Sequence, residues 1–251
     1  MIAKDYLEQT FSVEANDTLS HVKKMMLRHK STFALVFDNG AFSGLITAKS
    51  MLQKNKTGAK WKRRNVELLL ARNATLPNVP VITPDYSAAN VAKLLVRDSL
   101  PAVPVSDGKK IIGVVTRYSL LEHFNKNYKN AYKVSDLMHK DIVTVNKMHS
   151  VKHAHQLLFK RDLTKIVVED ERMPIGVVTD RDLLFKSEDG AQVKDIMSKG
   201  VYTVKPTDDA AAAGALMLKY RVSSLPVVGA ALMGVLTRSD LIKKIKEPQG
   251  R

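Results

Sequence analysis

The chain has 251 residues, of which 45% are hydrophobic and none is cysteine. This composition is typical of a globular protein with one or two domains, and it excludes a disulfide framework and a thiolate metal site. No apolar run approaches the roughly 20 residues of a membrane span, and the N-terminal residues lack the profile of a signal peptide. We therefore expect a soluble, cytoplasmic protein.

The formal net charge is +15, and most of the excess lies in the N-terminal half. Residues 1–133 carry 21 Lys and Arg against 10 Asp and Glu, whereas residues 134–251 carry 19 against 15. Such a balance favours anionic partners, which could be nucleotides, nucleic acids or acidic proteins.

Four similar segments follow one another along the chain, and each starts with a short strand, a polar turn and an amphipathic helix. These stretches are FSVEANDTLSHVKKMML (11–27), which is the weakest match, VITPDYSAANVAKLLV (81–96), IVTVNKMHSVKHAHQLLF (142–159) and VYTVKPTDDAAAAGALML (201–218). A β-rich piece follows in each: STFALVF (31–37), LPAVPV (100–105), LTKIVV (163–168) and SSLPVV (223–228). Each segment ends in a common signature: GLITAKSML (44–52), GVVTRYSLL (113–121), GVVTDRDLL (176–184) and GVLTRSDLI (234–242). The sequence therefore predicts an α/β (α+β) fold of four tandem units, each of the form strand–helix–strand–strand–helix.

The connections between the units predict how they group. Two near-identical stretches, VSDLMHKDIVTV (134–145) and VKDIMSKGVYTV (193–204), lead into the third and fourth units, and the polar stretch 125–133 separates these from the first two. Because each unit is too small to bury much core alone, we expect two pseudo-two-fold pairs. The predicted domains are residues 1–133, with units at about 7–55 and 74–128, and residues 134–251, with units at about 137–188 and 196–246.

The four signatures, the LPVV strand and the two leading stretches resemble those of CBS domains, and the resemblance covers about residues 7–246. Two CBS units packed sheet to sheet form a CBS pair, or Bateman module. We expect no attached catalytic or membrane domain, so the chain resembles stand-alone proteins with four CBS domains, which bind adenosyl ligands and act as sensors. The resemblance implies a non-enzymatic regulatory protein that requires no cofactor. Its regulatory ligand would be AMP, ADP, ATP or an S-adenosyl compound, and its partners a second copy of the chain in a homodimer and an effector protein of unknown identity.

The signature ends in Thr-x-x-Asp in units 3 and 4, where the acids are Asp182 and Asp240. This spacing fits a capping box that starts a helix. The resemblance implies a second, compatible use, in which the Thr hydroxyl binds a phosphate oxygen and the carboxylate accepts hydrogen bonds from both ribose hydroxyls. Units 1 and 2 carry Ser50 and Ser119 in place of the acid. We therefore expect ligand binding mainly in the C-terminal pair.

By the same resemblance, each cleft combines the signature of one unit with the first strand and the start of the LPVV strand of its partner. The residues expected around Asp182 are Thr179, Arg181, Val201, Tyr202 and Ser223. Those expected around Asp240 are Thr237, Arg238, Ile142, Val143, Thr164 and Lys165. The apolar side chains and Tyr202 are expected to sandwich an adenine ring. Lys165 and the signature arginines are expected to face phosphates or solvent.

The alternative function is nucleic-acid binding by the basic N-terminal half, with the CBS units as a scaffold. The segment KNKTGAKWKRR (54–64) holds six Lys and Arg and the single tryptophan, and residues 123–133 repeat this mixture of basic and aromatic residues. Basic groups neutralise phosphates, and aromatic rings stack on unpaired bases. The residues singled out for such contacts are Lys60, Trp61, Lys62, Arg63 and Arg64. A solvated linker is the simpler interpretation of both segments.

Metal and catalytic patterns are weak. His149 and His153 lie one helical turn apart, which suits a metal ion, but no third ligand is near and a solvated helix face is favoured. No Ser-His-Asp set, carboxylate pair or phosphate-binding glycine loop stands out. We therefore predict neither a metal site nor an enzyme.

Overall fold

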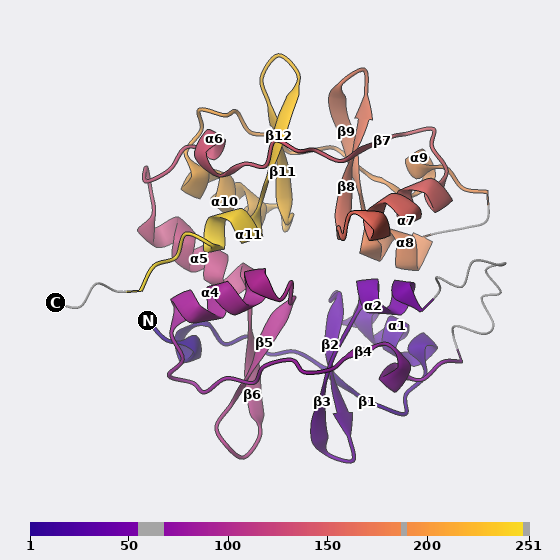
Figure 1. Cartoon of the computed structure of the whole chain (residues 1–251), viewed down its shortest axis with the longest axis vertical. Coiled ribbons are helices and arrows are strands. Elements are labelled where there is room, and N and C mark those ends of the chain that lie inside the picture. Colours follow the sequence, from indigo (N-terminus) through magenta and orange to yellow (C-terminus); the bar gives the residue numbers. More distant parts are fainter. Residues whose placement is uncertain (55–67, 187–189, 248–251) are drawn as a thin grey trace.

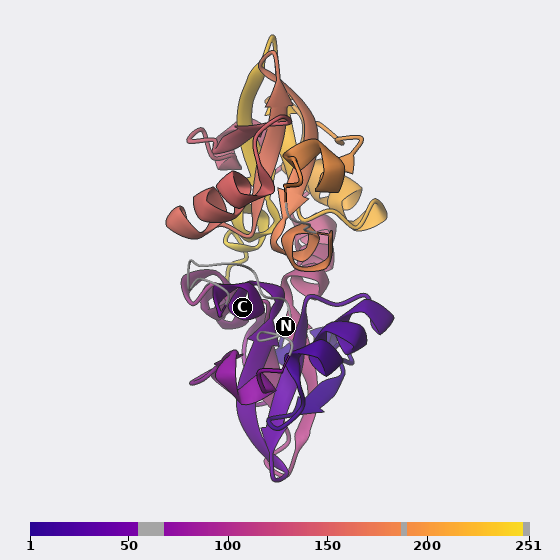
Figure 2. The same cartoon turned by 90° about the vertical axis from the view of Figure 1, so that its right-hand side faces the viewer.

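The computed structural model describes residues 1–54, 68–186 and 190–247. Four α/β units form two pairs, which lie one above the other along the long axis of the molecule (Figure 1, Figure 2). Units 1 and 2 form the N-terminal pair, and units 3 and 4 form the C-terminal pair. The predicted fold class is confirmed.

The elements of the N-terminal pair are β1 (Ser12–Glu14), α1 (Leu19–Arg28), β2 (Phe33–Asp38), β3 (Ala41–Thr47) and α2 (Ala48–Gln53) in unit 1, and α4 (Ala88–Arg97), β5 (Ala102–Ser106), β6 (Ile111–Thr116) and α5 (Arg117–Asn127) in unit 2. Those of the C-terminal pair are β7 (Thr144–Asn146), α7 (Val151–Lys160), β8 (Lys165–Asp170), β9 (Met173–Thr179) and α8 (Asp180–Lys186) in unit 3, and α10 (Ala210–Lys219), β11 (Ser224–Val228), β12 (Leu232–Thr237) and α11 (Arg238–Ile242) in unit 4. Short connecting elements are η1 (Ala3–Tyr6), η2 (Ala71–Asn73), β4 (Thr75–Leu76), α6 (Val134–Leu137), α9 (Val193–Ile196) and β10 (Ser198–Lys199).

The first strand differs between the units. In units 1 and 3 it pairs in parallel with the second strand, which continues into an antiparallel hairpin. In units 2 and 4 it is reduced to a single parallel bridge, between Ile82 and Val105 and between Val204 and Val227. The predicted order of elements is therefore complete in units 1 and 3 and shortened at its start in units 2 and 4.

The polar turn before the first helix of each unit provides a helix N-cap. In all four, a side-chain oxygen accepts a hydrogen bond from the backbone N–H three residues further along. The capping residues are Thr18, Ser87, Ser150 and Asp209. Such a cap satisfies a free N–H group of the first turn and so fixes where the helix starts.

Each signature glycine marks the place where a segment of the partner unit crosses the sheet. We call the four crossing segments leaders: residues 3–10, 71–78, 134–141 and 193–200. At every signature glycine, an added Cβ would lie within 3.0 Å of a leader carbonyl oxygen, so a larger residue has no room. The crossing pairs are Leu76 at Gly44, Glu8 at Gly113, Ser198 at Gly176 and His139 at Gly234. Each leader is therefore continuous in the chain with one unit, but its backbone pairs with the sheet of the other unit in the same pair.

The two pairs meet through their signature helices. Helix α2 packs on α8, and α5 packs on α10 and α11, in the middle of the molecule (Figure 1). Leu52 of α2 belongs to the buried core of unit 3, and Phe124 of α5 shares one core with Met217 and Leu241 of unit 4. A conformational change at a signature would thus occur close to the contact between the two pairs. In the described ranges, no helix combines the length and the apolar character that a membrane crossing requires.

Candidate ligand-binding clefts

The signature turns of units 3 and 4 hold Asp182 and Asp240 as buried carboxylates, 6% and 8% exposed. In each turn, Oδ2 of the acid accepts hydrogen bonds from the backbone N–H and the hydroxyl of the Thr three residues earlier, the latter at 2.7 Å. The backbone N–H of the acid donates in return to the Thr hydroxyl. These threonines are Thr179 and Thr237. The capping box is therefore present, and it holds one oxygen of each carboxylate.

The second carboxylate oxygen of each acid lies beside a side-chain nitrogen, which belongs to a lysine in one case and to a histidine in the other. Oδ1 of Asp182 lies 2.6 Å from Nζ of Lys186, and Oδ1 of Asp240 lies 2.5 Å from Nε2 of His139. Since a carboxylate oxygen has two lone pairs, both acids keep capacity for a ligand hydroxyl. The sequence analysis missed both nitrogens. The four-residue spacing on one helix could have indicated Lys186, but nothing local indicated His139.

Ser50 and Ser119 keep only the capping half of the signature. Each Oγ accepts from the backbone N–H of the preceding signature Thr and donates to the carbonyl oxygen of the same residue. The serine hydroxyls are thus used within the turn and bring no charge to the clefts of units 1 and 2.

Lys165 connects the residues predicted for the two clefts of the C-terminal pair. Its Nζ donates a hydrogen bond to Oγ of Ser223 in the partner unit, at 2.7 Å. Burial lowers the pKa of Lys165 to about 7, with the same effect from two nearby guanidinium groups and the opposite effect from two carboxylates. These groups are Arg238 and Arg117, and Asp180 and Asp240. Two guanidinium groups and two carboxylates thus surround this amine, and an anionic group of a ligand beside it would favour its protonated form.

The signature arginines lie against the N-terminal pair. The guanidinium group of Arg238 lies 5.2 Å from the ring centroid of Tyr118 on α5. Nη1 of Arg181 donates to the carbonyl oxygen of Ser31 in unit 1, at 3.2 Å. These contacts link each cleft of the C-terminal pair to the contact between pairs, while Nε of Arg238 is buried without a hydrogen-bond partner among the described residues.

The side chains expected to hold a base lie at the start of each unit. Ile142, Val143 and Val201 are half-buried, and Thr164 and Ser223 are exposed beside the starts of β8 and β11. Tyr202 stacks on Tyr220, with ring centroids 3.7 Å apart and an interplanar angle of 12°. Only the opposite face of the Tyr202 ring is therefore open to a base. The sequence analysis missed Tyr220.

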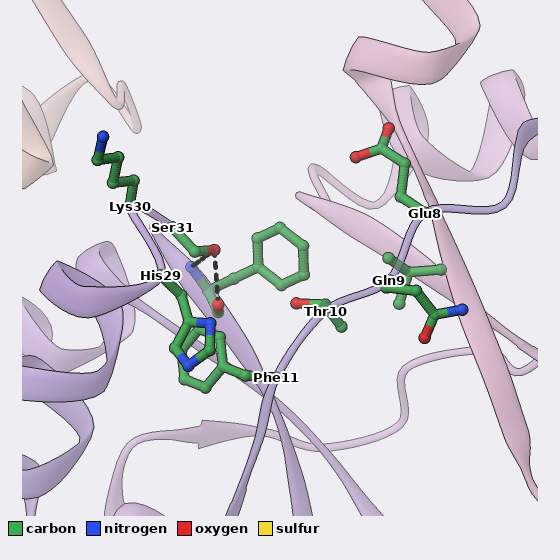
Figure 3. A pocket seen from close by; sticks show the side chains of 9 residues that line it. Glu8, Gln9, Thr10, Phe11, His29, Lys30 and Ser31 are labelled. Atoms are coloured by element: carbon green, nitrogen blue, oxygen red, sulfur yellow. Dashed lines mark hydrogen bonds between the residues drawn. The ribbon is translucent and has the colours of Figure 1, made fainter.

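A cavity of about 450 Å³ lies between units 1 and 2 of the N-terminal pair (Figure 3). It is lined by residues 8–11, residues 29–31, Phe33 and Val114. This volume is within the range of roughly 300–1,000 Å³ that small-molecule sites occupy. None of the lining residues was among the predicted ligand contacts, because the serine signatures directed attention to the C-terminal pair.

The two basic segments differ in what the structure describes. The residues proposed for nucleic-acid contact, Lys60, Trp61, Lys62, Arg63 and Arg64, lie outside the described residues. In the second segment, Phe124 is fully buried, and Tyr128 stacks on it at a centroid distance of 5.0 Å. Tyr132 stacks on Tyr128 in turn. Tyr128 and Tyr132 are half-buried and pack against the protein core, and Phe124 is part of it.

The histidine pair shows no metal geometry. The rings of His149 and His153 meet edge to face, with centroids 4.7 Å apart. Within the described ranges, no group of three or more His, Cys, Asp or Glu residues could hold a metal ion.

Comparisons with known proteins identify the family. A model of the CBS domain matches residues 3–55, 71–126, 134–189 and 193–247. Protein MJ1404 of Methanocaldococcus jannaschii is 30% identical over 178 residues, which are 62% of this chain and 42% of that protein. An inosine-5′-monophosphate dehydrogenase of Korarchaeum cryptofilum is 29% identical over 139 residues, which are 55% of this chain and 29% of the enzyme. The matched region thus spans less than half of the length of these curated relatives.

A solved structure shows the same fold over nearly the whole chain. Protein MJ1225 of Methanocaldococcus jannaschii aligns over 97% of this chain and 99% of its own, with a TM-score of 0.85 and 16% identity. At this identity, the likeness shows the fold alone. Because the family model matches four successive stretches that together cover most of the sequence, the chain belongs to the CBS-domain family.

Proposed function

We propose that the chain is a non-enzymatic regulatory protein that binds an adenine nucleotide or an S-adenosyl compound, mainly in the C-terminal pair. The observation that carries this proposal is the cleft of Asp240. There, a buried carboxylate suited to a ribose diol has near it Lys165, whose amine donates to Ser223 of the partner unit and in its protonated form suits a phosphate or carboxylate. Asp182 repeats the carboxylate in the other cleft of the pair.

The proposed mechanism is a shift between arrangements of the two pairs. The helices that begin at the proposed ligand-binding signatures also form the contact between pairs. Two arginines of these signatures, Arg238 and Arg181, contact residues of the N-terminal pair. A ligand that favours one position of these helices stabilises the arrangement of pairs that goes with it. The size of the response is limited by the difference in the ligand's affinity for the two arrangements.

A regulatory role also agrees with how little of a related enzyme this chain matches. The inosine-5′-monophosphate dehydrogenase is matched over only 29% of its length, while all four stretches matched in this chain are CBS domains. We propose that the chain acts on an effector protein of unknown identity, and a homodimer stays a prediction.

The proposal is tested by isothermal titration calorimetry of the full chain with AMP, ATP and S-adenosylmethionine. Asp182→Ala and Asp240→Ala should each remove one binding event or weaken it about 10- to 100-fold, because hydrogen bonds to a carboxylate contribute about 1.5–3 kcal/mol. Asp98→Ala is the matched control, since Asp98 pairs with Arg97 at the surface and such pairs contribute little. Absence of binding at millimolar concentration, or binding indifferent to both acids, would contradict the proposed function.

A further inference from the structure

At two of the four crossings, the residue whose carbonyl oxygen lies at the signature glycine also contacts that signature with its side chain, Glu8 through Thr116 and His139 through Asp240. The four clefts can therefore be compared at two positions, the crossing residue of the leader and the last polar residue of the signature. From unit 1 to unit 4, these combinations are Leu76 with Ser50, Glu8 with Ser119, Ser198 with Asp182 and His139 with Asp240. A carboxylate is thus present in three clefts, but in the cleft of unit 2 it comes from the leader.

Glu8 binds its signature threonine as the acids of the C-terminal pair do. Oε1 of Glu8 accepts a hydrogen bond from the hydroxyl of Thr116 at 2.7 Å. Asp240 accepts from the hydroxyl of Thr237 at the same distance. Glu8 is half-buried, and within the described chain its side chain accepts no hydrogen bond other than that of Thr116, so Oε2 is available to a ligand.

The space beside Glu8 is large enough for a nucleoside. Glu8 lines the cavity of about 450 Å³, whose apolar walls include Phe11, Phe33 and Val114. Figure 3 shows Glu8 and Lys30 on opposite sides of this cavity, with Thr10 between them. Apolar walls suit a base, and a carboxylate suits the hydroxyl donors of a sugar.

We infer that the cleft of unit 2 is a ligand site in which Glu8 replaces the missing signature acid and accepts the vicinal hydroxyls of a nucleoside ribose. The inference takes its ligand class from the proposed function, but it concerns the other pair. It differs from the expectation that, because of the serine signatures, neither cleft of the N-terminal pair binds a ligand well. The cleft of unit 1, with Leu76 and Ser50, has no carboxylate at either position and stays without such a site.

The test separates this cleft from those of the C-terminal pair in the intact chain. In an Asp182→Asn/Asp240→Asn background, calorimetry should still detect AMP binding with a stoichiometry of one. Glu8→Gln in that background should weaken AMP about 10-fold or more, because the remaining amide accepts hydroxyls poorly. The same variant should weaken 2′-deoxy-AMP by a smaller factor than AMP, since this probe keeps the 3′-hydroxyl and lacks the 2′-hydroxyl that Glu8 would also accept. Glu122→Gln, an exposed change on α5, is the matched control.

A second variant distinguishes the loss of a ligand contact in Glu8→Gln from a disturbance of the local fold. Adding Ser119→Asp should return a carboxylate to the signature and restore much of the preference for AMP over 2′-deoxy-AMP. Loss of all AMP binding in the Asn background, while the unaltered chain binds, would overturn the inference and leave the proposed function standing. An AMP preference that Glu8→Gln does not change would also overturn it. Failure of the unaltered chain to bind AMP and S-adenosylmethionine contradicts the proposed function itself.

Discussion

Lys165 lies where one protonation event changes the charge of a candidate cleft near neutral pH. Burial lowers its pKa to about 7, and the surrounding arginines act in the same direction. The neighbouring Asp180 has its pKa raised to about 6 by burial. Above pH 7, Asp180 is therefore mostly ionised, and Lys165 is the group of the two that still changes charge.

We predict that AMP binding to the C-terminal pair weakens as the pH rises from 7 to 9, by about 10-fold. A phosphate beside Lys165 favours the protonated amine, so binding above pH 7 must take up a proton, and this becomes harder as protons become scarcer. Calorimetry in two buffers of different ionisation enthalpy measures the proton uptake directly.

Lys165→Met should weaken AMP binding at pH 7 and flatten its pH dependence, whereas Asp180→Asn should leave the fall above pH 7 in place. An affinity that is constant between pH 7 and 9 in the unaltered chain would show that no phosphate lies beside Lys165.

At this scale, the sequence predicted contacts that are local and missed those that cross between units. The pairing of Thr179 with Asp182 follows from a three-residue spacing at a helix start, and it is present. The contacts of His139 with Asp240 and of Glu8 with Thr116 depend on how a leader passes over another unit. No periodicity in the chain encodes that crossing, so neither contact could be predicted from the sequence.

Among the secondary-structure elements, the shortened first strands of units 2 and 4 have a chemical reason. Pro80 and Pro84 flank the bridge at Ile82, and Pro206 follows the bridge at Val204 closely. Proline has no N–H to donate, so it ends a ladder where units 1 and 3 continue it. The apolar residues of these stretches predicted full strands, and the prolines beside them shorten the ladder to a single bridge.

The crossing of leaders over signature glycines predicts a graded cost for added methyl groups. At Gly234, an added Cβ would lie 2.7 Å from the carbonyl oxygen of His139 and 2.9 Å from the sulfur of Met138, whereas at Gly113 the nearest atom, the carbonyl oxygen of Glu8, is 3.0 Å away. Overpacking typically costs about 1–3 kcal/mol. We expect Gly234→Ala to lower the free energy of unfolding by more than Gly113→Ala, as measured by urea denaturation. Equal costs would indicate that the leader moves aside freely.

For the whole molecule, the decisive feature is a core shared between the pairs. Leu52 of α2 is 1% exposed and packs in the core of unit 3, and α5 shares its core with α10 and α11. Each pair alone would expose this apolar surface to water. The sequence predicted two pairs from the polar stretch before Lys133, but their mutual packing could not be derived, since helix faces of similar composition can bury against several partners.

We predict that residues 1–133 and 134–251, produced as separate chains and mixed, associate into a 1:1 complex, because each covers the apolar helix faces of the other. Analytical ultracentrifugation measures the association. Leu52→Asp should abolish or strongly weaken it, since a charge would be buried in the core of unit 3. Leu27→Asp, at a leucine that is 49% exposed, should not. Two fragments that remain monomeric when mixed would contradict the shared core.

The crossing of leaders has a consequence for how such chains diversify. Some side chains that contact a signature are encoded at the start of a different unit, since Glu8 lies at the start of unit 1 but contacts the signature of unit 2, and His139 lies at the start of unit 3 but contacts that of unit 4. A recombination event at the junction before a unit therefore alters the neighbouring cleft without any substitution in its signature. If the clefts bind ligands as we propose, ligand preference is inherited through the junctions between repeats as well as through the repeats themselves.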